Sequence, residues 1–210
     1  MMSIIELLLV TCIIVKSYYH YAYFKKILNN KDSIKQLIYP PVTILICARN
    51  EAHNLKEFLG DILRQKYSNF EVLVVNHLSS DKSQQILLEY QEVYPQLRIV
   101  EITEKGTYLT GKRQALYEGI KKASHDIILC TDADCFPKSA LWIEKMVQPF
   151  VEEKIDFVLG FSPYTFKGRN WLAHIIESET TQTAMLYLSY ALCGKPFMGV
   201  GRNLALKNPS

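Results

Sequence analysis

The chain reads Asp126-Ile127-Ile128-Leu129-Cys130-Thr131-Asp132-Ala133-Asp134-Cys135 where an apolar run meets two carboxylates. The apolar residues Ile127 to Cys130 indicate a strand that is buried on both faces. In extended backbone, residues two apart point to the same side, so Asp132 and Asp134 are expected to bring two negative charges together. Like charges this close repel unless a cation lies between them. The pair therefore predicts either a site for Mg²⁺ or Mn²⁺, which prefer oxygen ligands, or an ordinary polar turn.

Apolar runs of the same kind recur on both sides of this stretch. They predict strands over residues 42–48, 70–75, 97–102, 126–130 and 155–161. Apolar residues spaced three and four positions apart predict helices between them, over residues 55–63, 86–94, 115–123 and 141–147. A longer helix is expected over 171–191, where the alternation stops. This order predicts an α/β fold in which helices flank a mostly parallel central sheet.

Polar residues follow three of the predicted strands. Arg49-Asn50-Glu51 follows the first strand, Asn76-His77 the second, and Asp132-Ala133-Asp134 the fourth. Ligands of such sheets bind outside the carboxyl ends of the strands, so these segments are the candidate binding residues.

A basic pair, Lys112-Arg113, follows Gly111 at the start of the third helix. Cations oppose the dipole at a helix N-terminus, so they predict either a bound phosphate between them or a solvated helix start. The sequence has no Gly-x-x-x-x-Gly-Lys-Ser/Thr loop and no Gly-x-Gly-x-x-Gly after the first strand. Both a P-loop nucleotidase and a dinucleotide-binding domain are therefore disfavoured.

Composition narrows the class of protein further. The 210 residues allow one large or two small domains, and a net charge of +3 offers no broad basic face for nucleic acid. The five cysteines are far apart and form no Cys-x-x-Cys pair. Reduced thiols in a reducing compartment are therefore expected.

The N-terminus differs in character from the rest of the chain. Residues 4–15 are almost all apolar, an aromatic cluster occupies 18–24, and Lys25 and Lys26 follow. This pattern predicts that residues 1–26 form a membrane-anchor helix, either spanning the bilayer or lying in its interface. A buried amphipathic helix is the alternative. Because basic residues flank cytoplasmic ends, the following domain is expected on the cytoplasmic side, after a linker over residues 27–41.

Several segments, in order, resemble the family 2 glycosyltransferases of GT-A fold. Residues 42–51 resemble the opening strand and its Asn-Glu signature, and residues 65–75 resemble the second strand of the family. The later matches are Ser79-Ser80-Asp81, the helix opened by Gly111-Lys112, the Asp-x-Asp motif Thr131–Asp134, and the Gly-rich segment 199–205. The resemblance covers about residues 42–208 and implies a GT-A domain over 42–210.

The resemblance also implies a function. It predicts metal-dependent, inverting transfer of a sugar from a nucleotide-sugar donor, with a UDP-sugar favoured, to a hydroxyl of a polysaccharide or lipid-linked glycan. It assigns donor binding to Ala48, Arg49, Glu51, His77, Lys112 and Asp132. It assigns Mg²⁺ or Mn²⁺ to Asp132 and Asp134, and the acceptor side to Gly201, Arg202 and Asn203.

The sequence departs from the family pattern at two points. His77 stands where the family usually carries an Asp that contacts the base. No acidic pair that could supply the general base follows Asn203, so the base is expected beyond Ser210 and the chain is expected to lack the C-terminal part of the domain. Two alternatives remain open: a catalytically impaired nucleotide-binding module, and a nucleotidyltransferase, although Arg49-Asn50-Glu51 is not the Gly-rich basic loop that such an enzyme requires.

Overall fold

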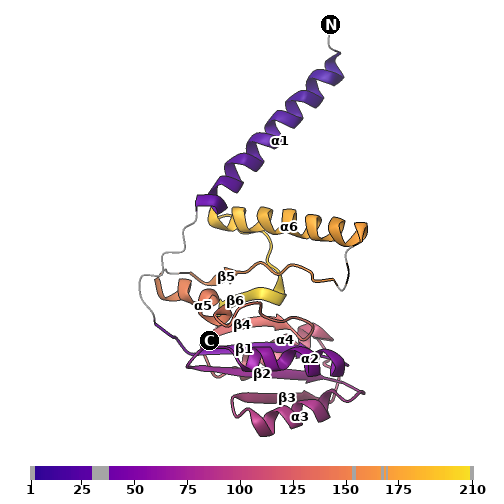
Figure 1. Ribbon diagram of the computed structural model, residues 1–210, viewed down its shortest axis with the longest axis vertical. Coiled ribbons are helices and arrows are strands. Elements are labelled where there is room, and N and C mark those ends of the chain that lie inside the picture. Colours follow the sequence, from indigo (N-terminus) through magenta and orange to yellow (C-terminus); the bar gives the residue numbers. More distant parts are fainter. Residues whose placement is uncertain (1–2, 30–37, 153–154, 167, 169, 209–210) are drawn as a thin grey trace. The chain divides into compact units, whose positions relative to one another are not determined.

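The computed structural model describes residues 3–29, 38–152, 155–166, 168 and 170–208. The chain divides into two compact units. One unit combines residues 1–33 with 161–199, and the other combines 34–160 with 200–210. Figure 1 shows the helices and strands of both units.

A mixed sheet of six strands forms the centre of the second unit (Figure 1). The strands are β1 (Val42–Ala48), β2 (Phe70–His77), β3 (Leu97–Ile102), β4 (Ile127–Asp132), β5 (Phe157–Leu159) and β6 (Leu204–Lys207). Their order across the sheet is β3-β2-β1-β4-β6-β5. The strands β1 to β4 are mutually parallel, whereas β6 runs antiparallel to both β4 and β5. The predicted α/β fold with a mostly parallel sheet is confirmed.

Helices cover both faces of this sheet because its central strands carry apolar side chains on both faces. The helices are α2 (Ala52–Leu63), α3 (Ser83–Val93), α4 (Lys112–Lys122) and α5 (Trp142–Glu152). One buried cluster joins Ile44 and Val74 of the sheet to α2, α3 and α5. The other joins Leu45 and Val75 to α4. A Cβ at Gly119 would collide with Leu45, so α4 packs directly on β1 through a glycine.

The structure differs from the predicted elements at the C-terminal side of the sheet. Strand β5 covers three residues, whereas the apolar run predicted a strand over 155–161. The segment Leu204–Lys207 forms β6 between β4 and β5, which the sequence did not predict as a strand. Helix α5 continues past Val147 to Glu152 with Pro149 inside it, and Phe150 is buried there. Burial of the last turn therefore outweighs the backbone hydrogen bond that proline cannot donate.

The first unit contains two long helices, α1 (Ile4–Asn29) and α6 (Trp171–Leu192). The rings of Tyr23 and Tyr190 stack with centroids 4.2 Å apart, which joins the C-terminal ends of the two helices. The ring of Phe197 meets Tyr190 edge-on at 5.2 Å. Part of the predicted linker is helical, because α1 continues to Asn29, and residues 30–37 of that linker lie outside the described residues.

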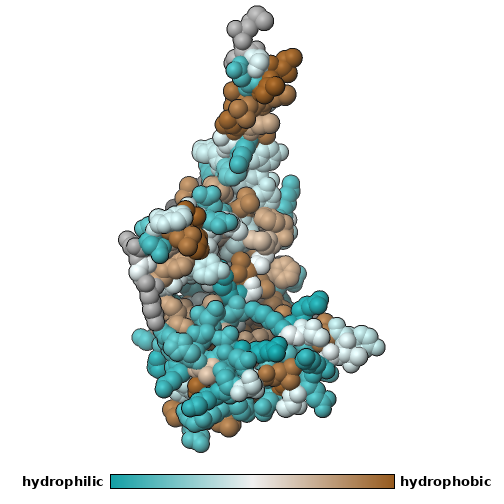
Figure 2. All heavy atoms as spheres, turned by 90° about the vertical axis from the view of Figure 1, so that its right-hand side faces the viewer, coloured by the Kyte–Doolittle hydropathy of each residue, from teal (hydrophilic) through white to brown (hydrophobic). Residues whose placement is uncertain are grey.

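Among the described residues, one helix is long and apolar enough to cross a membrane: Ile4–Leu28, 25 residues with a mean hydropathy of 1.4. At 1.5 Å per residue it is about 37 Å long, against about 30 Å of bilayer hydrocarbon. Figure 2 shows apolar side chains gathered over its N-terminal part, where Ile4, Ile5 and Leu8 are exposed. Signal sequences and core helices of soluble proteins meet the same length and hydropathy criterion, so this feature alone is weak evidence for an anchor.

Candidate functional site

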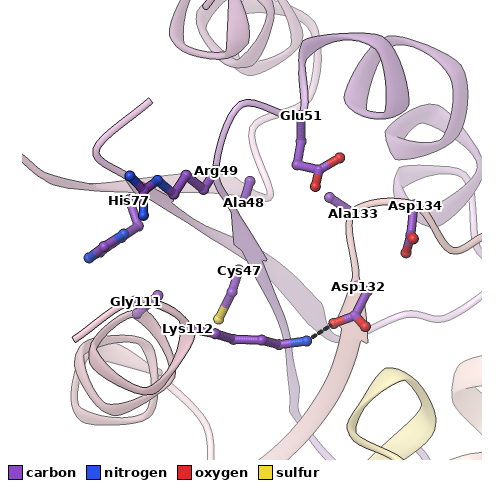
Figure 3. Close-up of a pocket in the computed structure, with 11 residues that line it drawn as sticks. Cys47, Ala48, Arg49, Glu51, His77, Gly111, Lys112, Asp132, Ala133 and Asp134 are labelled. Carbon is purple, nitrogen blue, oxygen red and sulfur yellow. Dashed lines mark hydrogen bonds and ion pairs between the residues drawn. The ribbon is translucent and has the colours of Figure 1, made fainter. Parts of the chain in front are cut away.

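A cavity of about 280 Å³ opens at the carboxyl ends of β1, β2 and β4 (Figure 3). All of its lining residues belong to the unit that contains the sheet. They are Cys47, Ala48, Arg49, Glu51, His77, Gly111, Lys112, Ala115, Asp132, Ala133 and Asp134. The cavity thus brings together all the residues that the sequence assigned to donor and metal binding, from segments up to 86 positions apart.

Parallel pairing explains why these residues meet. Cys47 of β1 lies opposite Asp132 of β4, and Ala48 lies opposite Asn76 of β2, so three strands end at one edge of the sheet. The sequence did not single out Cys47 or Ala115 as lining residues, and it named Gly111 and Ala133 only within the segments that carry Lys112, Asp132 and Asp134. Gly111 and Ala115 carry little or no side chain, and their small size next to Lys112 is the sequence signal for open space at that helix end.

The two carboxylates do not both lie on the strand. Asp132 is the last residue of β4, and Asp134 lies in a turn that follows, closed by a 3.1 Å hydrogen bond from Cys135 N–H to the carbonyl of Asp132. The extended geometry that the sequence predicted for Asp134 is therefore wrong. Both carboxylates nonetheless line the cavity, because the turn folds back at the strand end (Figure 3).

Lys112 and Asp132 form an ion pair across the cavity (Figure 3). Lys112 is the first residue of α4, where the helix dipole disfavours a cation, and the carboxylate of Asp132 supplies the compensating anion. Burial lowers the pKa of Lys112, but the hydrogen bond and the charge of Asp132, aided by Cys47 and Asp134, raise it above its usual value. Lys112 is therefore cationic at neutral pH. Arg113, its predicted partner for a phosphate, is not among the described residues that line the cavity.

The thiol of Cys47 lies beside this ion pair (Figure 3). Burial raises its pKa to about 11, with Asp132 adding to the shift and Lys112 opposing it. The sulfur is a neutral thiol at neutral pH, so it is not an activated nucleophile.

Two loops at the rim of the cavity are joined by side-chain hydrogen bonds. The N–H of Asn50 donates to Ser79 Oγ at 3.0 Å, and the N–H of Ser80 donates to Asn50 Oδ1 at 2.8 Å. Asp81 Oδ2 accepts from the N–H of Ala52 at 3.0 Å and thereby caps α2. Asp81 Oδ1 also accepts from both the N–H and the hydroxyl of Ser83. This brace, defined by Asn50, Ser79, Ser80, Asp81 and Ser83, holds the segment that carries Arg49 and Glu51.

His77 ends β2 and is 3% exposed. Its Nε2 lies 3.1 Å from Oε1 of Gln114 on α4, a partner that the sequence did not predict. The next residue, Leu78, has a φ of 52°, in the left-handed region that residues other than glycine rarely adopt. The backbone therefore turns sharply where β2 leaves the sheet, directly after the cavity-lining histidine.

The predicted acceptor-side residues lie elsewhere. Gly201, Arg202 and Asn203 form the short 3₁₀ helix η1 before β6 and are not among the described residues that line the cavity. Asn203 Oδ1 accepts from the indole N–H of Trp142 at 3.0 Å, and its carbonyl accepts from the N–H of Gly160 at 2.9 Å. These contacts tie β5 and β6 to α5, so Asn203 has a packing role here.

The chemistry of the site is defined by its charges. Among the described residues, no three His, Cys, Asp or Glu side chains group closely enough to hold a metal ion by themselves. Asp132 and Asp134 therefore offer two carboxylates, which suits a cation whose other ligands come from a bound molecule and from water. Lys112 offers one cation, in direct contact with the carboxylate of Asp132.

Comparison with known proteins gives one family match and several relatives. The model of the family described as "Glycosyl transferase family 2" matches residues 43–205. The glycosyltransferase AglE of Haloferax volcanii is 31% identical over 144 residues, which are 67% of this chain and 45% of that protein. The poly-beta-1,6-N-acetyl-D-glucosamine synthase of Staphylococcus aureus is 32% identical over 107 residues, which are 51% of this chain and 25% of that protein. The chain thus spans less than half the length of these curated relatives.

Solved structures share the fold. The mannosyltransferase PcManGT from Pyrobaculum calidifontis, in complex with GDP-Man and Mn²⁺, superposes with a TM-score of 0.69 at 22% identity and covers 90% of this chain and 51% of its own. TarS of S. aureus, in complex with UDP-GlcNAc, gives a TM-score of 0.51 at 21% identity, covering 62% of this chain and 36% of its own. At this level of identity the likeness establishes the fold alone.

Proposed function

Because the chain belongs to glycosyl transferase family 2, we propose that it transfers a sugar from a nucleotide-sugar donor to a hydroxyl of a glycan or lipid-linked acceptor. The observation that carries this proposal is the cavity at the sheet edge, which Asp132, Asp134 and Lys112 line together. Family membership favours sugar transfer over the nucleotidyl transfer that shares this layout. A nucleotide sugar as the donor is in line with the UDP-GlcNAc complex of TarS and the GDP-Man complex of PcManGT. Among nucleotide sugars we propose a UDP-sugar, which the sequence resemblance favours.

The donor is proposed to lie along the strand ends. Ala48, Arg49, Glu51 and His77 would line the nucleoside, because they surround one side of the cavity. Lys112 would neutralise the diphosphate, since its ammonium group is a cation that lines the cavity beside Asp132. The brace would hold Arg49 and Glu51, which line the proposed nucleoside site, in place during binding.

Asp132 and Asp134 are the proposed ligands of Mg²⁺ or Mn²⁺. Both residues line the cavity, Asp134 is exposed, and hard cations of this size use one or two carboxylates together with substrate phosphates. Bound there, the cation would offset the charge that grows on the departing diphosphate. The transfer is proposed to invert the anomeric carbon in one in-line displacement. We assign no general base to any described residue.

We further propose that α1 anchors the chain in a membrane with the sheet-containing unit on the cytoplasmic side. The support is the length and hydropathy of Ile4–Leu28 and the basic residues Lys25 and Lys26 near its C-terminal end. The acceptor would then be a membrane-associated lipid-linked sugar or a growing polysaccharide, and not a nucleic acid.

The metal and donor assignment is tested by calorimetry with UDP, with and without Mn²⁺. Replacing Asp134→Ala should weaken Mn²⁺-dependent UDP binding by at least about 100-fold, because even residues that only support a metal ligand cost 10–100-fold. The matched control is Asp126→Ala, which removes an exposed carboxylate at the opposite end of β4 and should leave UDP affinity unchanged. If Asp134→Ala bound UDP with the same Mn²⁺-dependent affinity as wild type, Asp134 would not be a metal ligand.

Turnover distinguishes an enzyme from a binding module. The wild-type protein, supplied with UDP-sugars and membrane lipids, should release UDP at a rate that Asp134→Ala abolishes. Binding of UDP without any release from UDP-sugars would favour the impaired module instead.

A further inference from the structure

The first turns of α6 expose large apolar side chains to solvent. Trp171 is 74% exposed, and Leu172 and Ile175 are 50% and 51% exposed. Residues three and four apart lie on the same side of a helix, so Ile175 shares a side with both Trp171 and Leu172. Ala173, which points to another side, is only 4% exposed. We call the group of Trp171, Leu172 and Ile175 the α6 patch.

The α6 patch lies on the side of α6 that contacts α1. At the other end of α6, the ring of Tyr190 stacks on Tyr23 of α1, with centroids 4.2 Å apart. The 18 positions from Leu172 to Tyr190 make about five full helical turns, so the two side chains point the same way, about 27 Å apart along the axis. Both helices belong to one compact unit, in which α1 rises from the C-terminal end of α6 (Figure 1).

Tyr23 marks the level that a membrane surface would have on α1. Starting at Ile4, the apolar helix needs about 20 residues to cross about 30 Å of hydrocarbon, and it reaches Tyr23 at that point. Exposed tyrosines precede Tyr23, and the exposed Lys25 and Lys26 follow it, as is typical of the boundary between hydrocarbon and headgroups. A helix that packs on Tyr23 therefore lies at the level of the headgroups.

The charges around this junction suit a lipid surface. The N–H of Lys195 donates to the carbonyl of Tyr190 at 2.9 Å, so a third exposed lysine lies close to Lys25 and Lys26 of α1. Cations at this level are attracted by anionic headgroups. Residues 171–176 contain no Asp or Glu, so the α6 patch itself carries no carboxylate that a bilayer would repel.

We propose that α6 lies on the surface of the bilayer that α1 enters, with the α6 patch inserted between the phospholipid headgroups. The inference rests on the proposed anchoring by α1, because that helix sets the level of the bilayer. Three side chains are too few for stable attachment, since even a whole fatty acyl chain gives only reversible binding. The helix α1 therefore holds the chain, and the α6 patch fixes how the unit of α1 and α6 is turned on the membrane.

The two tryptophans of the chain are the reporters for a test by fluorescence. Trp171 belongs to the α6 patch, whereas Trp142 lies in the sheet-containing unit and donates to Asn203 Oδ1 at 3.0 Å. The full chain is reconstituted in vesicles of phosphatidylglycerol and phosphatidylcholine, with the phosphatidylcholine either unmodified or brominated high on its acyl chains. Bromine quenches a tryptophan that it contacts.

Trp142→Phe leaves Trp171 as the only tryptophan. Its emission should fall by roughly half or more in the brominated vesicles, because interfacial side chains reach the upper acyl chains. Trp171→Phe, which leaves only Trp142, should not be quenched. The difference between wild type and Trp171→Phe gives the emission of Trp171 with Trp142 in place, so the test does not depend on the folding of Trp142→Phe. Equal quenching of the two tryptophans overturns the inference.

A matched pair of positions on α6 tests which side meets the lipid. Thr181 is exposed and lies about two and a half turns before Tyr190, so it points away from α1. In the Trp171→Phe background, Ile175→Trp should restore the quenching and Thr181→Trp should not. Quenching of equal size at both positions contradicts the proposed orientation.

The two proposals fail in different ways. If the full chain does not float with the vesicles in a density gradient, anchoring by α1 and this inference fall together. If the chain floats and the emission of Trp171 is blue-shifted but not quenched, protein covers the α6 patch, either the sheet-containing unit or a second copy. If it floats and Trp171 emits as in water, the patch stays exposed. In both of these cases only the inference falls.

Discussion

At the scale of single residues, Glu71 is the clearest case of a buried charge that depends on its partners. Its carboxylate accepts from Thr43 Oγ1 at 2.7 Å, from Arg98 at 2.7 Å and from both the N–H and the hydroxyl of Ser124. Burial raises the pKa of Glu71, but the hydrogen bonds from Arg98, Thr43 and Ser124 outweigh it and hold the pKa below 4.5. The ionised carboxylate is thus favoured by folding.

Replacing Glu71→Gln should lower the free energy of unfolding by about 1–3 kcal/mol at pH 7, because it leaves buried donors imperfectly paired. A depressed pKa stabilises the fold above the unfolded pKa, and this contribution is lost as pH falls below 4.5 through the lower folded pKa. Urea denaturation at pH 7 and pH 3 should therefore show a smaller acid destabilisation in Glu71→Gln. Glu101→Gln, on the exposed side of β3, is the control and should behave as wild type.

Lys112 is the residue whose charge we expect to matter for binding more than for stability. Ion pairs exposed to water contribute about 0–1 kcal/mol to folding, so Lys112→Met should change the unfolding free energy little. The same change should weaken UDP binding by about 10-fold or more, because hydrogen bonds between a cation and a phosphate are among the stronger ones. Calorimetry on Lys112→Met and on the control Lys121→Met, at the other end of α4, measures this. Equal affinities of the two variants for UDP would contradict the assignment of Lys112 to the diphosphate.

The sequence identified most single residues of the site because strand ends are visible in it. The apolar runs end within two residues of the ends of β1, β2 and β4, so Glu51, His77 and Asp132 were candidates from local pattern, and the family resemblance assigned their roles. The contact between His77 and Gln114 joins residues that are 37 positions apart in the sequence. No periodicity encodes such a contact, and the same holds for the closed turn at Asp134.

At the scale of elements, the packing of α4 on β1 depends on a glycine. A Cβ at Gly119 would meet Val75 at 3.0 Å and Leu45 closer still, and both are core side chains. Gly119→Ala should therefore lower the unfolding free energy by about 1–3 kcal/mol, as overpacking does, despite the better helix propensity of alanine. Thermal denaturation measures this.

Gly60 in α2 is the matched helical glycine. A Cβ there would meet only the mobile end of Arg64, at 2.8 Å. Gly60→Ala should therefore raise the unfolding free energy by up to about 1 kcal/mol, the difference in helix propensity. Destabilisation of equal size at Gly60 and Gly119 would show that close packing on β1 is not the cause.

The brace around Asp81 links two elements to the site. Asp81→Ala removes the cap of α2 and should cost about 1 kcal/mol of stability. It should also weaken UDP binding several-fold, because Arg49 and Glu51 lose their support. Denaturation and calorimetry check both effects, with Asp61→Ala as the control, since the carboxylate of Asp61 pairs with Arg64 on the surface of α2. If Asp81→Ala lowers the stability but leaves the affinity for UDP unchanged, the brace contributes to folding and not to donor binding.

Strands and helices with long apolar patterns were predictable, whereas of the two short strands β6 was not predicted and β5 was predicted too long, over 155–161. The segment Leu204–Lys207 has only four residues, and β5 has three. Each is a strand because the neighbouring strand offers hydrogen bonds, and not because its own sequence alternates. The edge of the sheet beyond β4 is therefore determined by tertiary pairing, which local patterns do not report.

At the scale of the whole molecule, α1 is proposed to control location. Deleting residues 1–29 should release the protein from the membrane fraction, because the apolar helix Ile4–Leu28 is removed. Sedimentation of full-length and shortened protein after expression in bacteria measures this, and UDP binding by the shortened protein serves as the control for folding. A shortened protein that still sediments with washed membranes would contradict anchoring by α1 alone.

The ion pair between Lys112 and Asp132 has a consequence for how the site responds to its surroundings. A diphosphate that engages Lys112 takes the place of the carboxylate of Asp132, so binding at this point is an exchange of one anion for another. The net charge near Lys112 then changes less than at a lysine that meets its ligand from bulk water. Added salt weakens both the contact of Lys112 with Asp132 and its contact with the diphosphate. The affinity for UDP should therefore depend only weakly on ionic strength.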